Sequence, residues 1–447
     1  MTSPERRKRV PLSYRAIQRW ATVAVSIIYR RVHVTARSRL LENRPVILTA
    51  NHSAALADVA IMIKEISEYP HFLAAASWWK SPPARMLFNA GGVVPIHRAR
   101  DGKGMKENLS AFEACNTTLA TGARIAIFPE GEMSDEPALL PLKTGAARIA
   151  LGAAGDAGIQ GVVVVPVGLV YEEMGKFRRD VELQFGEPID IDEWIESYRT
   201  DRAKAVRGLT DFIADRLAQI TMNHGSAEEA SLIDRAAALA LADGGGSGAA
   251  EFVRRNALRR ALAGAVTLAG GESSTEYGDL VAAVDAHVHD LERLGLDVRD
   301  VTMLASASDE RSRLALEVVA LSAPAALGVV ANAPTLVGVL LARRRFPKDA
   351  WQATAMGVGA TVFSPVVWVA EFAVLARFGR GRALALTAAG AASGLAAIAW
   401  SERFRQWRRI TKRDRLERDQ RLAVEEARSS RAAVRCAVEA LVGDIPT

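Results

Sequence analysis

Short apolar segments alternate with helical segments over residues 30–190, and this alternation restricts the fold more than any other feature of the chain. The segments at 45–50 and 161–169 are apolar and have the length of buried strands, and the second is rich in β-branched residues. Helical segments, such as 58–66, separate such runs. Strands that alternate with helices are typical of an α/β domain with a mixed, largely parallel sheet. We therefore expect such a domain over residues 32–200.

The last third of the chain is much more apolar than the rest. Hydrophobic residues make up 49% of the 447 residues, and the mean hydropathy of +0.07 is slightly high for a soluble enzyme. Apolar runs at 318–342, 350–376 and 383–400 have lengths near the roughly 20 residues that a membrane-spanning helix needs. These runs predict a region that is embedded in a membrane.

Two features of these runs disfavour three simple spans. Asn332-Ala-Pro334 and Pro365 interrupt the first two runs near their middles. Basic residues follow both runs, at 343–345 and 377–382, and two successive basic loops cannot both be cytoplasmic if the run between them crosses once. We therefore favour re-entrant or in-plane helical hairpins, with a buried helical bundle in a soluble domain as the alternative.

The remaining segments are helical. The N-terminal segment has helical periodicity and basic residues, so it either lies on a membrane or packs on the α/β domain. The predicted organisation is a basic amphipathic N-terminal helix at 1–31, the α/β domain at 32–200, a helical middle region at 201–312, membrane-embedded or re-entrant helices at 313–401 and a basic C-terminal helical tail at 402–447.

The net charge of +6 suits anionic lipid, a phosphorylated substrate or nucleic acid. We expect no nucleic-acid partner, because no aromatic stacking platform or known motif accompanies the basic residues of the tail. Cys115 and Cys436 lie far apart, which predicts neither a disulfide framework nor a zinc site. His287 and His289 would face apart on a helix, so we expect no metal there either.

Four short motifs stand at the ends of predicted strands. They are Asn51-His52 with Asp58, Gly92-Val-Val-Pro-Ile-His-Arg98, Phe128-Pro-Glu-Gly131 and Val165-Pro-Val-Gly168. Side chains at strand ends on one edge of a sheet commonly form active sites. The set therefore predicts one site that several strands build together.

The chemistry of these residue types favours proton transfer beside an anion. The imidazole of His52 can accept a proton from a hydroxyl group near neutral pH, and Asp58 would fix its tautomer. Arg98 offers a fork of donors for phosphate, and Lys143 offers a second positive charge, although either can serve in a surface ion pair. Ser53 is the rival nucleophile, but it lacks the Gly-x-Ser-x-Gly turn that would expose it.

The four motifs in this order resemble the glycerophospholipid (PlsC-type) acyltransferase family, over about residues 30–190. The resemblance implies that His52 deprotonates the acceptor hydroxyl, which attacks an acyl thioester, and that Asp58 orients His52. It further implies that Arg98, Glu130 and Gly131 hold a glycerol phosphate. Val165 and Pro166 match the fourth block, with the acyl side as its suggested role.

One spacing departs from that family. Four residues separate histidine and aspartate in the family, whereas five separate His52 from Asp58 here. One extra residue rotates a side chain by about 100° on a regular helix. Either the turn before the helix accommodates the extra residue, or Asp58 does not pair with His52.

The C-terminal half resembles the extension of fungal-type glycerol-3-phosphate and dihydroxyacetone-phosphate acyltransferases, at Leu294-Gly-Leu-Asp297, Asn332-Ala-Pro334 and Lys348–Thr354. The resemblances together imply a membrane-associated O-acyltransferase. It would move an acyl group from acyl-CoA or acyl-carrier protein to glycerol 3-phosphate, and the alternative acceptor is 1-acylglycerol 3-phosphate.

The expected location is the cell membrane, with the catalytic domain on the cytoplasmic side, membrane lipids as partners, and no metal or redox cofactor. A non-catalytic, lipid-binding membrane scaffold is the alternative of another class, because the spacing between His52 and Asp58 is altered. Hydrolysis of acyl-CoA is a third possibility.

Overall fold

The computed structural model contains two compact units. The N-terminal unit comprises Met1–Met222 together with Pro347–Gly357, and the helical unit comprises Asn223–Phe346 with Val358–Thr447. The structure describes residues 10–445 except 41–43, 67–68, 98–107, 135, 137, 242–248, 297, 299–309 and 346–348.

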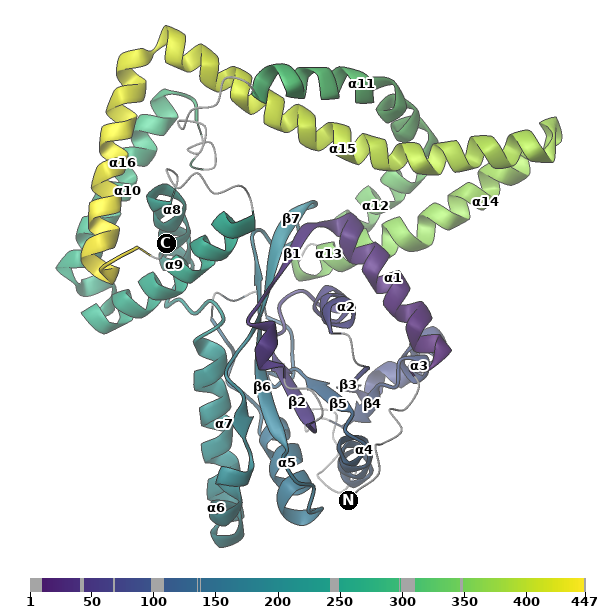
Figure 1. The fold of residues 1–447 in the computed structure, drawn as a ribbon, viewed down its shortest axis with the longest axis vertical. Helices are drawn as coiled ribbons and strands as arrows, with labels where there is room; N and C mark the ends of the chain where they lie inside the picture. Colours follow the sequence, from purple (N-terminus) through teal and green to yellow (C-terminus); the bar gives the residue numbers. More distant parts are fainter. Residues whose placement is uncertain are drawn as a thin grey trace. The chain divides into compact units, whose positions relative to one another are not determined.

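A mixed sheet forms the centre of the N-terminal unit (Figure 1). Its eight strands follow the order β1-β7-β6-β2-β5-β3-β4, and β8 pairs with β6. Only the pairings of β6 with β7 and with β8 are antiparallel. The prediction of a mixed, largely parallel sheet is therefore confirmed. The strands are β1 (Tyr29–Thr35), β2 (Val46–Ala50), β3 (Pro70–Ala75), β4 (Val94–Ile96), β5 (Arg124–Ile127), β6 (Val163–Tyr171), β7 (Arg179–Phe185) and β8 (Ile189–Asp190).

Helices cover both faces of this sheet, because the central strands are apolar on both sides. Val46 and Leu48 of β2 pack in one core with helices α1 (Leu12–Ile28) and α2 (Leu56–Glu65). Ile47, between them, packs in the opposite core. The helices that contribute to that second core are α4 (Leu109–Ala120), α5 (Gly145–Leu151) and α7 (Arg202–Ala218). The shorter helices of this unit are η1 (Arg37–Arg39), η2 (Ala76–Lys80), α3 (Pro82–Ala90), η5 (Gly152–Asp156), η6 (Asp192–Trp194) and α6 (Ile195–Thr200).

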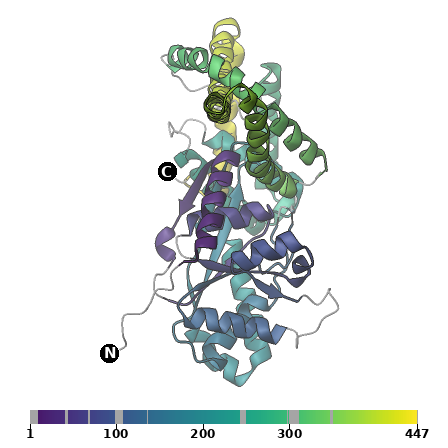
Figure 2. The same cartoon turned by 90° about the vertical axis from the view of Figure 1, so that its right-hand side faces the viewer.

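The N-terminal helix α1 packs on the α/β domain along one face. Tyr14, Ala21 and Val25 are buried there, and Figure 2 shows the purple helix beside the sheet. Leu12 and Val23 stay exposed on the other side. Packing on the domain, one of the two predicted roles of this helix, is thus observed, and its outer face remains available for a membrane.

Helix α13 (Asp349–Val358) joins the N-terminal unit although it lies far along the chain. The sequence pattern assigned these residues to the second apolar run. Their burial instead places Thr354, Ala355 and Met356 in contact with the α/β domain.

The helical unit begins with a bundle that has its own core. Helices α8 (Ala227–Ala240), α9 (Ala249–Ala269), α10 (Thr275–Arg293) and α16 (Arg421–Val442) share this core, and η7 (Gly271–Ser273) joins α9 to α10. The predicted C-terminal helical tail includes α16, which packs in this core. One face of α16, with Val424, Ala427, Val434 and Val438, is apolar and buried in the bundle.

The apolar part of the helical unit consists of long helices (Figure 1). They are α11 (Glu310–Ala331), α12 (Ala333–Arg345), η9 (Gly359–Phe363), α14 (Ser364–Leu375), η10 (Ala376–Phe378) and α15 (Arg380–Asp419). A helix ends at the first predicted break, Asn332. At Pro365 the chain stays helical, because the π-helical turn η9 leads directly into α14. Helix α15 is continuous, so the third apolar run and the basic segment after it form one helix of 40 residues.

Three helical stretches, Glu310–Ala331, Thr354–Phe378 and Arg380–Asp419, are long and apolar enough to cross a membrane. Only 12% to 17% of their most apolar windows is buried, so their side chains face outward instead of forming the core of a soluble bundle. The choice between spanning and re-entrant helices stays a prediction.

Small residues bring α11 and α15 into close contact. A Cβ atom at Gly328 would collide with the backbone carbonyl of Ser393. The amide of Asn332, at the break after α11, donates to the carbonyl oxygens of Gly328 and Gly390 at 2.9 and 3.1 Å and accepts from Trp368 at 3.1 Å. Small side chains and a shared amide are typical of helix packing in membranes.

We expect Gly328→Ala to destabilise the helical unit by about 1–3 kcal/mol, because the added methyl group overpacks the contact with α15. Gly338→Ala is the control, since a Cβ atom there meets nothing within 4 Å, and it should be neutral or stabilising by up to about 1 kcal/mol. Thermal unfolding in detergent measures both variants. Equal midpoints for the two would contradict the close packing of α11 on α15.

Candidate active site

The candidate site begins where β2 ends. Residues 51–55 connect β2 to α2, and Phe128 follows β5, the parallel neighbour of β2. The carboxyl ends of β2 and β5 therefore meet at one edge of the sheet. This arrangement brings the first and third sequence motifs together.

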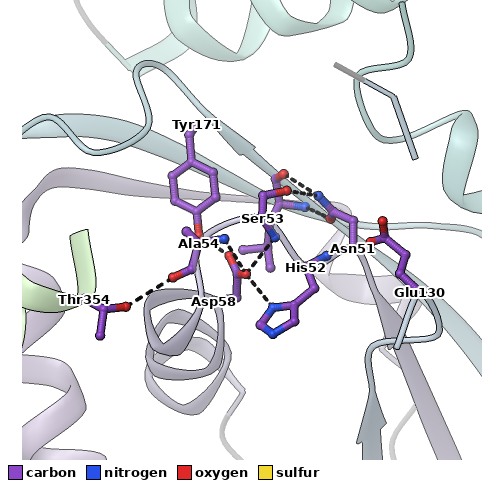
Figure 3. A network of polar contacts seen from close by, with 9 residues as sticks. Asn51, His52, Ser53, Ala54, Asp58, Glu130, Tyr171 and Thr354 are labelled. Carbon is purple, nitrogen blue, oxygen red and sulfur yellow. Dashed lines mark hydrogen bonds and ion pairs between the residues drawn. The ribbon is translucent and has the colours of Figure 1, made fainter. Parts of the chain in front are cut away.

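His52 and Asp58 form a hydrogen bond despite their unusual spacing (Figure 3). The distance between His52 Nδ1 and Asp58 Oδ2 is 2.9 Å. The connecting turn accommodates the extra residue, because Ala55, just before α2, has φ of 52° and ψ of −126°. L residues rarely adopt this region, and a single such residue costs about 1–3 kcal/mol. The alternative in which Asp58 does not pair with His52 is therefore wrong.

The Asp58 carboxylate is fully buried and receives four hydrogen bonds. Its Oδ2 atom accepts from the backbone N–H groups of Ser53 and Ala54 at 3.0 and 2.8 Å, in addition to His52. Its Oδ1 atom accepts a short hydrogen bond from the hydroxyl of Tyr171 on β6. The partners of Asp58 are all donors, so the carboxylate acts as the acceptor and His52 Nδ1 donates.

Tyr171 keeps its proton in this environment. Burial raises the pKa of Tyr171 well above its usual value, and the nearby Asp58 carboxylate raises this pKa further. The hydroxyl therefore remains a donor to Asp58 at physiological pH. Tyr171 was not among the predicted site residues. Its signal in the sequence is the strand period of two, which puts it on the same face of β6 as Val165.

The third motif holds His52 from the other side. The ring of His52 stacks on Phe128, with 4.0 Å between the ring centroids. Glu130 Oε1 accepts from the backbone N–H of His52 at 2.9 Å, and Glu130 Oε2 accepts from that of Leu140 at 3.0 Å. Burial raises the pKa of Glu130, whereas these two hydrogen bonds lower it. The backbone N–H of Ser134 donates to the carbonyl oxygen of His52 at 3.1 Å.

Gly131 and Lys143 lie beside each other next to this loop. Gly131 has φ of +73°, and a Cβ atom there would lie 3.3 Å from Lys143 Cγ, so glycine fits both the backbone and the space. The ammonium-bearing side chain of Lys143 is exposed. The structure thus brings His52, Asp58, Glu130, Gly131 and Lys143 into one region through this motif.

Arg98 lies outside the described residues. Beside it in sequence, the Asn108 side chain accepts from the His97 N–H at 2.8 Å and donates to the His97 carbonyl at 2.7 Å.

The fourth motif is part of the sheet itself. Val165 and Pro166 are buried in β6, where they pair with Leu48 and Thr49 of β2. Farther along β6, Leu169 exchanges two hydrogen bonds with the Asn51 side chain, at 2.7 and 3.0 Å. The role of Asn51 was also missed by the sequence analysis. The fourth motif therefore supports the strand that carries the partners of Asn51 and Asp58.

This geometry suits a general base. With Nδ1 bonded to Asp58, the Nε2 atom of His52 is the ring nitrogen that can accept a proton. The His52 side chain is 18% exposed, whereas Asp58 is at 0%. A substrate can therefore reach the imidazole but not the carboxylate.

Comparison with known proteins agrees with this chemistry. Residues 31–170 match the family model described as Acyltransferase. This part of the chain is therefore similar to the acyltransferase family, and its mixed, largely parallel sheet has the fold class that the sequence predicted.

Three relatives illustrate the similarity. The chain is 38% identical to glycerol-3-phosphate O-acyltransferase 2 of Saccharomyces cerevisiae over 118 residues, which are 26% of this chain and 16% of the relative. It is 27% identical to lyso-ornithine lipid O-acyltransferase of Brucella abortus over 38% of this chain and 70% of the relative. The solved structure of the 1-acyl-sn-glycerophosphate (LPA) acyltransferase PlsC from Thermotoga maritima is 20% identical, with a TM-score of 0.34, over 45% of this chain and 77% of that chain. The match thus spans about a sixth of the yeast relative.

We expect Tyr171→Phe to lower the free energy of unfolding of the acyltransferase domain by about 1–3 kcal/mol, because it removes a donor from a buried carboxylate. Tyr14→Phe is the matched control. Tyr14 is also buried, but its hydroxyl has no hydrogen-bond partner among the described residues. Denaturant titration in detergent measures both, and equal stability would argue against the hydrogen bond to Asp58.

Proposed function

We propose that this protein is a membrane-associated O-acyltransferase that moves a fatty acyl group from a thioester donor to the hydroxyl of glycerol 3-phosphate. The observation that carries the proposal is the buried Asp58 carboxylate 2.9 Å from Nδ1 of a partly exposed His52. The acyltransferase domain and two yeast relatives named glycerol-3-phosphate O-acyltransferase 1 and 2 support it.

The transfer proceeds without a covalent enzyme intermediate. His52 Nε2 takes the proton of the acceptor hydroxyl while the oxygen attacks the thioester carbonyl. The new C–O ester bond forms, the C–S bond breaks, and the imidazolium returns its proton to the leaving thiolate. Asp58 stabilises the imidazolium that forms in between. The donor is acyl-CoA or acyl-carrier protein, and the activated thioester needs neither a metal nor a redox cofactor.

The acceptor phosphate lies near Gly131 in this proposal. The exposed Lys143 beside Gly131 offers a positive charge, and Arg98 would supply a second one. Glu130 uses its two oxygens on backbone N–H groups, so its contribution is to fix His52 and the glycine turn. Val165 and Pro166 support the site from β6, and we extend to them the suggested acyl-side role of their motif.

Membrane attachment follows from the three apolar helical stretches, whose side chains mostly face outward. We propose the cell membrane as the location and the cytoplasmic side for the acyltransferase domain, where thioester donors are made. Membrane lipids are then both neighbours and products.

The test is acyl transfer by the purified full chain in lipid nanodiscs, with radiolabelled acyl-CoA or acyl-carrier protein. Glycerol 3-phosphate, dihydroxyacetone phosphate, 1-acylglycerol 3-phosphate and a lyso-ornithine lipid are supplied separately. We expect the highest kcat/KM with glycerol 3-phosphate. A higher value with 1-acylglycerol 3-phosphate would move the assignment to the second acylation step, and release of thiol without any acceptor would indicate a hydrolase.

His52→Ala and Asp58→Asn should each lower kcat by about 10²- to 10⁴-fold, because the first removes the base and the second removes the carboxylate that orients it. Lys143→Gln should mainly raise KM for the acceptor. Asn108→Ala removes both hydrogen bonds to the His97 backbone, next to Arg98, without removing a charge. Wild-type turnover by His52→Ala would contradict the mechanism, and no transfer to any acceptor would favour a lipid-binding scaffold.

A further inference from the structure

Helix α13 is a distant part of the chain that lies against the candidate active site. It follows the apolar helix α12 in sequence and precedes η9 and α14, yet it belongs to the N-terminal unit. Three successive residues, Thr354, Ala355 and Met356, are buried there with exposed fractions of 8%, 9% and 4%. Burial of three successive residues means that more than one side of the helix is enclosed.

The contact of α13 with the turn after His52 is direct (Figure 3). Thr354 Oγ1 lies 3.5 Å from the carbonyl oxygen of Ala54, a long hydrogen bond across 300 residues of sequence. The N–H of the same residue, Ala54, donates to Asp58 at 2.8 Å. A single residue, Ala54, thus links Thr354 to the carboxylate that orients His52.

Gly357 of α13 lies close to the side chain of Ile28 in α1. A Cβ atom at Gly357 would collide with the end of the Ile28 side chain, at the last turn of α1. Ile28 is itself buried, at 4% exposed. The absence of a side chain at Gly357 therefore sets how closely α13 approaches the α/β domain.

The turn after His52 has a strained backbone that contacts from other parts of the chain must stabilise. Ala55 has a positive φ that costs energy in an L residue, and such a conformation persists only where the surroundings hold it. Within the turn, the Ala57 N–H donates to the Ala54 carbonyl at 3.0 Å. The Thr354 hydroxyl adds a second donor to that carbonyl from another part of the chain.

We propose that α13 is a positioning element of the active site, in which Thr354 and the close contact at Gly357 hold residues 53–55 so that Asp58 meets His52. This inference rests on the proposed function, because it assigns α13 a part in setting kcat. A helix that lies between two apolar segments of the chain would then contact the turn after His52 and influence its conformation.

The first test separates the hydroxyl of Thr354 from general stability. Thr354→Val should lower kcat about two- to tenfold with little change in acceptor KM, and Thr354→Ser should restore it. Thr210→Val is the matched control, since Thr210 is buried in the same unit but donates to Val206 within its own helix. Equal kcat for Thr354→Val and wild type, or equal losses in Thr354→Val and Thr210→Val, would overturn the proposal.

The second test uses the contact at Gly357. Gly357→Leu should lower kcat about 10- to 100-fold by displacing α13, and the added Ile28→Ala substitution should restore part of the activity by making room. Thermal unfolding shows whether both variants keep the wild-type midpoint. If they do, and the double variant has no higher kcat than Gly357→Leu, the contact at Gly357 does not position α13.

Hydrogen exchange of residues 51–58 distinguishes this inference from the proposed function. Thr354→Val should speed exchange of the Ser53 and Ala54 amides, which donate to Asp58, and Thr210→Val should leave them unchanged. If the wild type transfers no acyl group, the proposed function fails, and with it the part of α13 in setting kcat, but exchange still decides whether α13 holds the turn. If transfer occurs and exchange is the same in all variants, only the role of α13 is refuted.

Discussion

The buried carboxylate of Asp58 is the interaction on which the rest of the site depends. Burying a charged group costs free energy unless hydrogen bonds replace its solvation. Removing one partner therefore destabilises the folded protein. Asp58 is satisfied by two backbone amides, an imidazole and a phenol. These donors come from the turn after β2 and from β6, so the carboxylate couples the conformation of the turn to the position of a neighbouring strand. The strained geometry of Ala55 is stable because this set of bonds requires it.

The order of the strands explains why residues far apart in sequence share this site. β2 lies between β5 and β6, and both pair with it in parallel. The motif after β5 therefore contacts His52 through Phe128 and Glu130, whereas β6 contributes Tyr171 and the backbone partner of Asn51. Each motif is only a few residues long and means little by itself. The sheet brings them together so that an imidazole, a buried carboxylate and a lysine lie in one region.

The sequence predicted the α/β domain well, because alternating runs at 45–50 and 161–169 are local patterns. It also predicted the break at Asn332, where the residue types themselves disturb a helix, whereas at Pro365 the helix continues through a π-helical turn. It could not decide whether Asp58 forms a hydrogen bond with His52. That bond depends on a positive φ at Ala55, and alanine does not signal such a conformation. It missed Tyr171 and Thr354 because their partners are 113 and 300 residues away. The burial of α16 was hidden for a similar reason, since its basic composition outweighed its one apolar face.

The place of α13 in the chain has a consequence for how the protein is made. Residues up to Met222 leave the ribosome first, yet the N-terminal unit also includes Pro347–Gly357. At roughly 5–20 residues per second, the 135 residues from 222 to 357 take on the order of 10–30 s to synthesise. The apolar helices α11 and α12 emerge within that interval. The turn after His52 therefore acquires its last neighbour only after the chain has begun to deliver apolar segments to the membrane, so completion of the site follows that step.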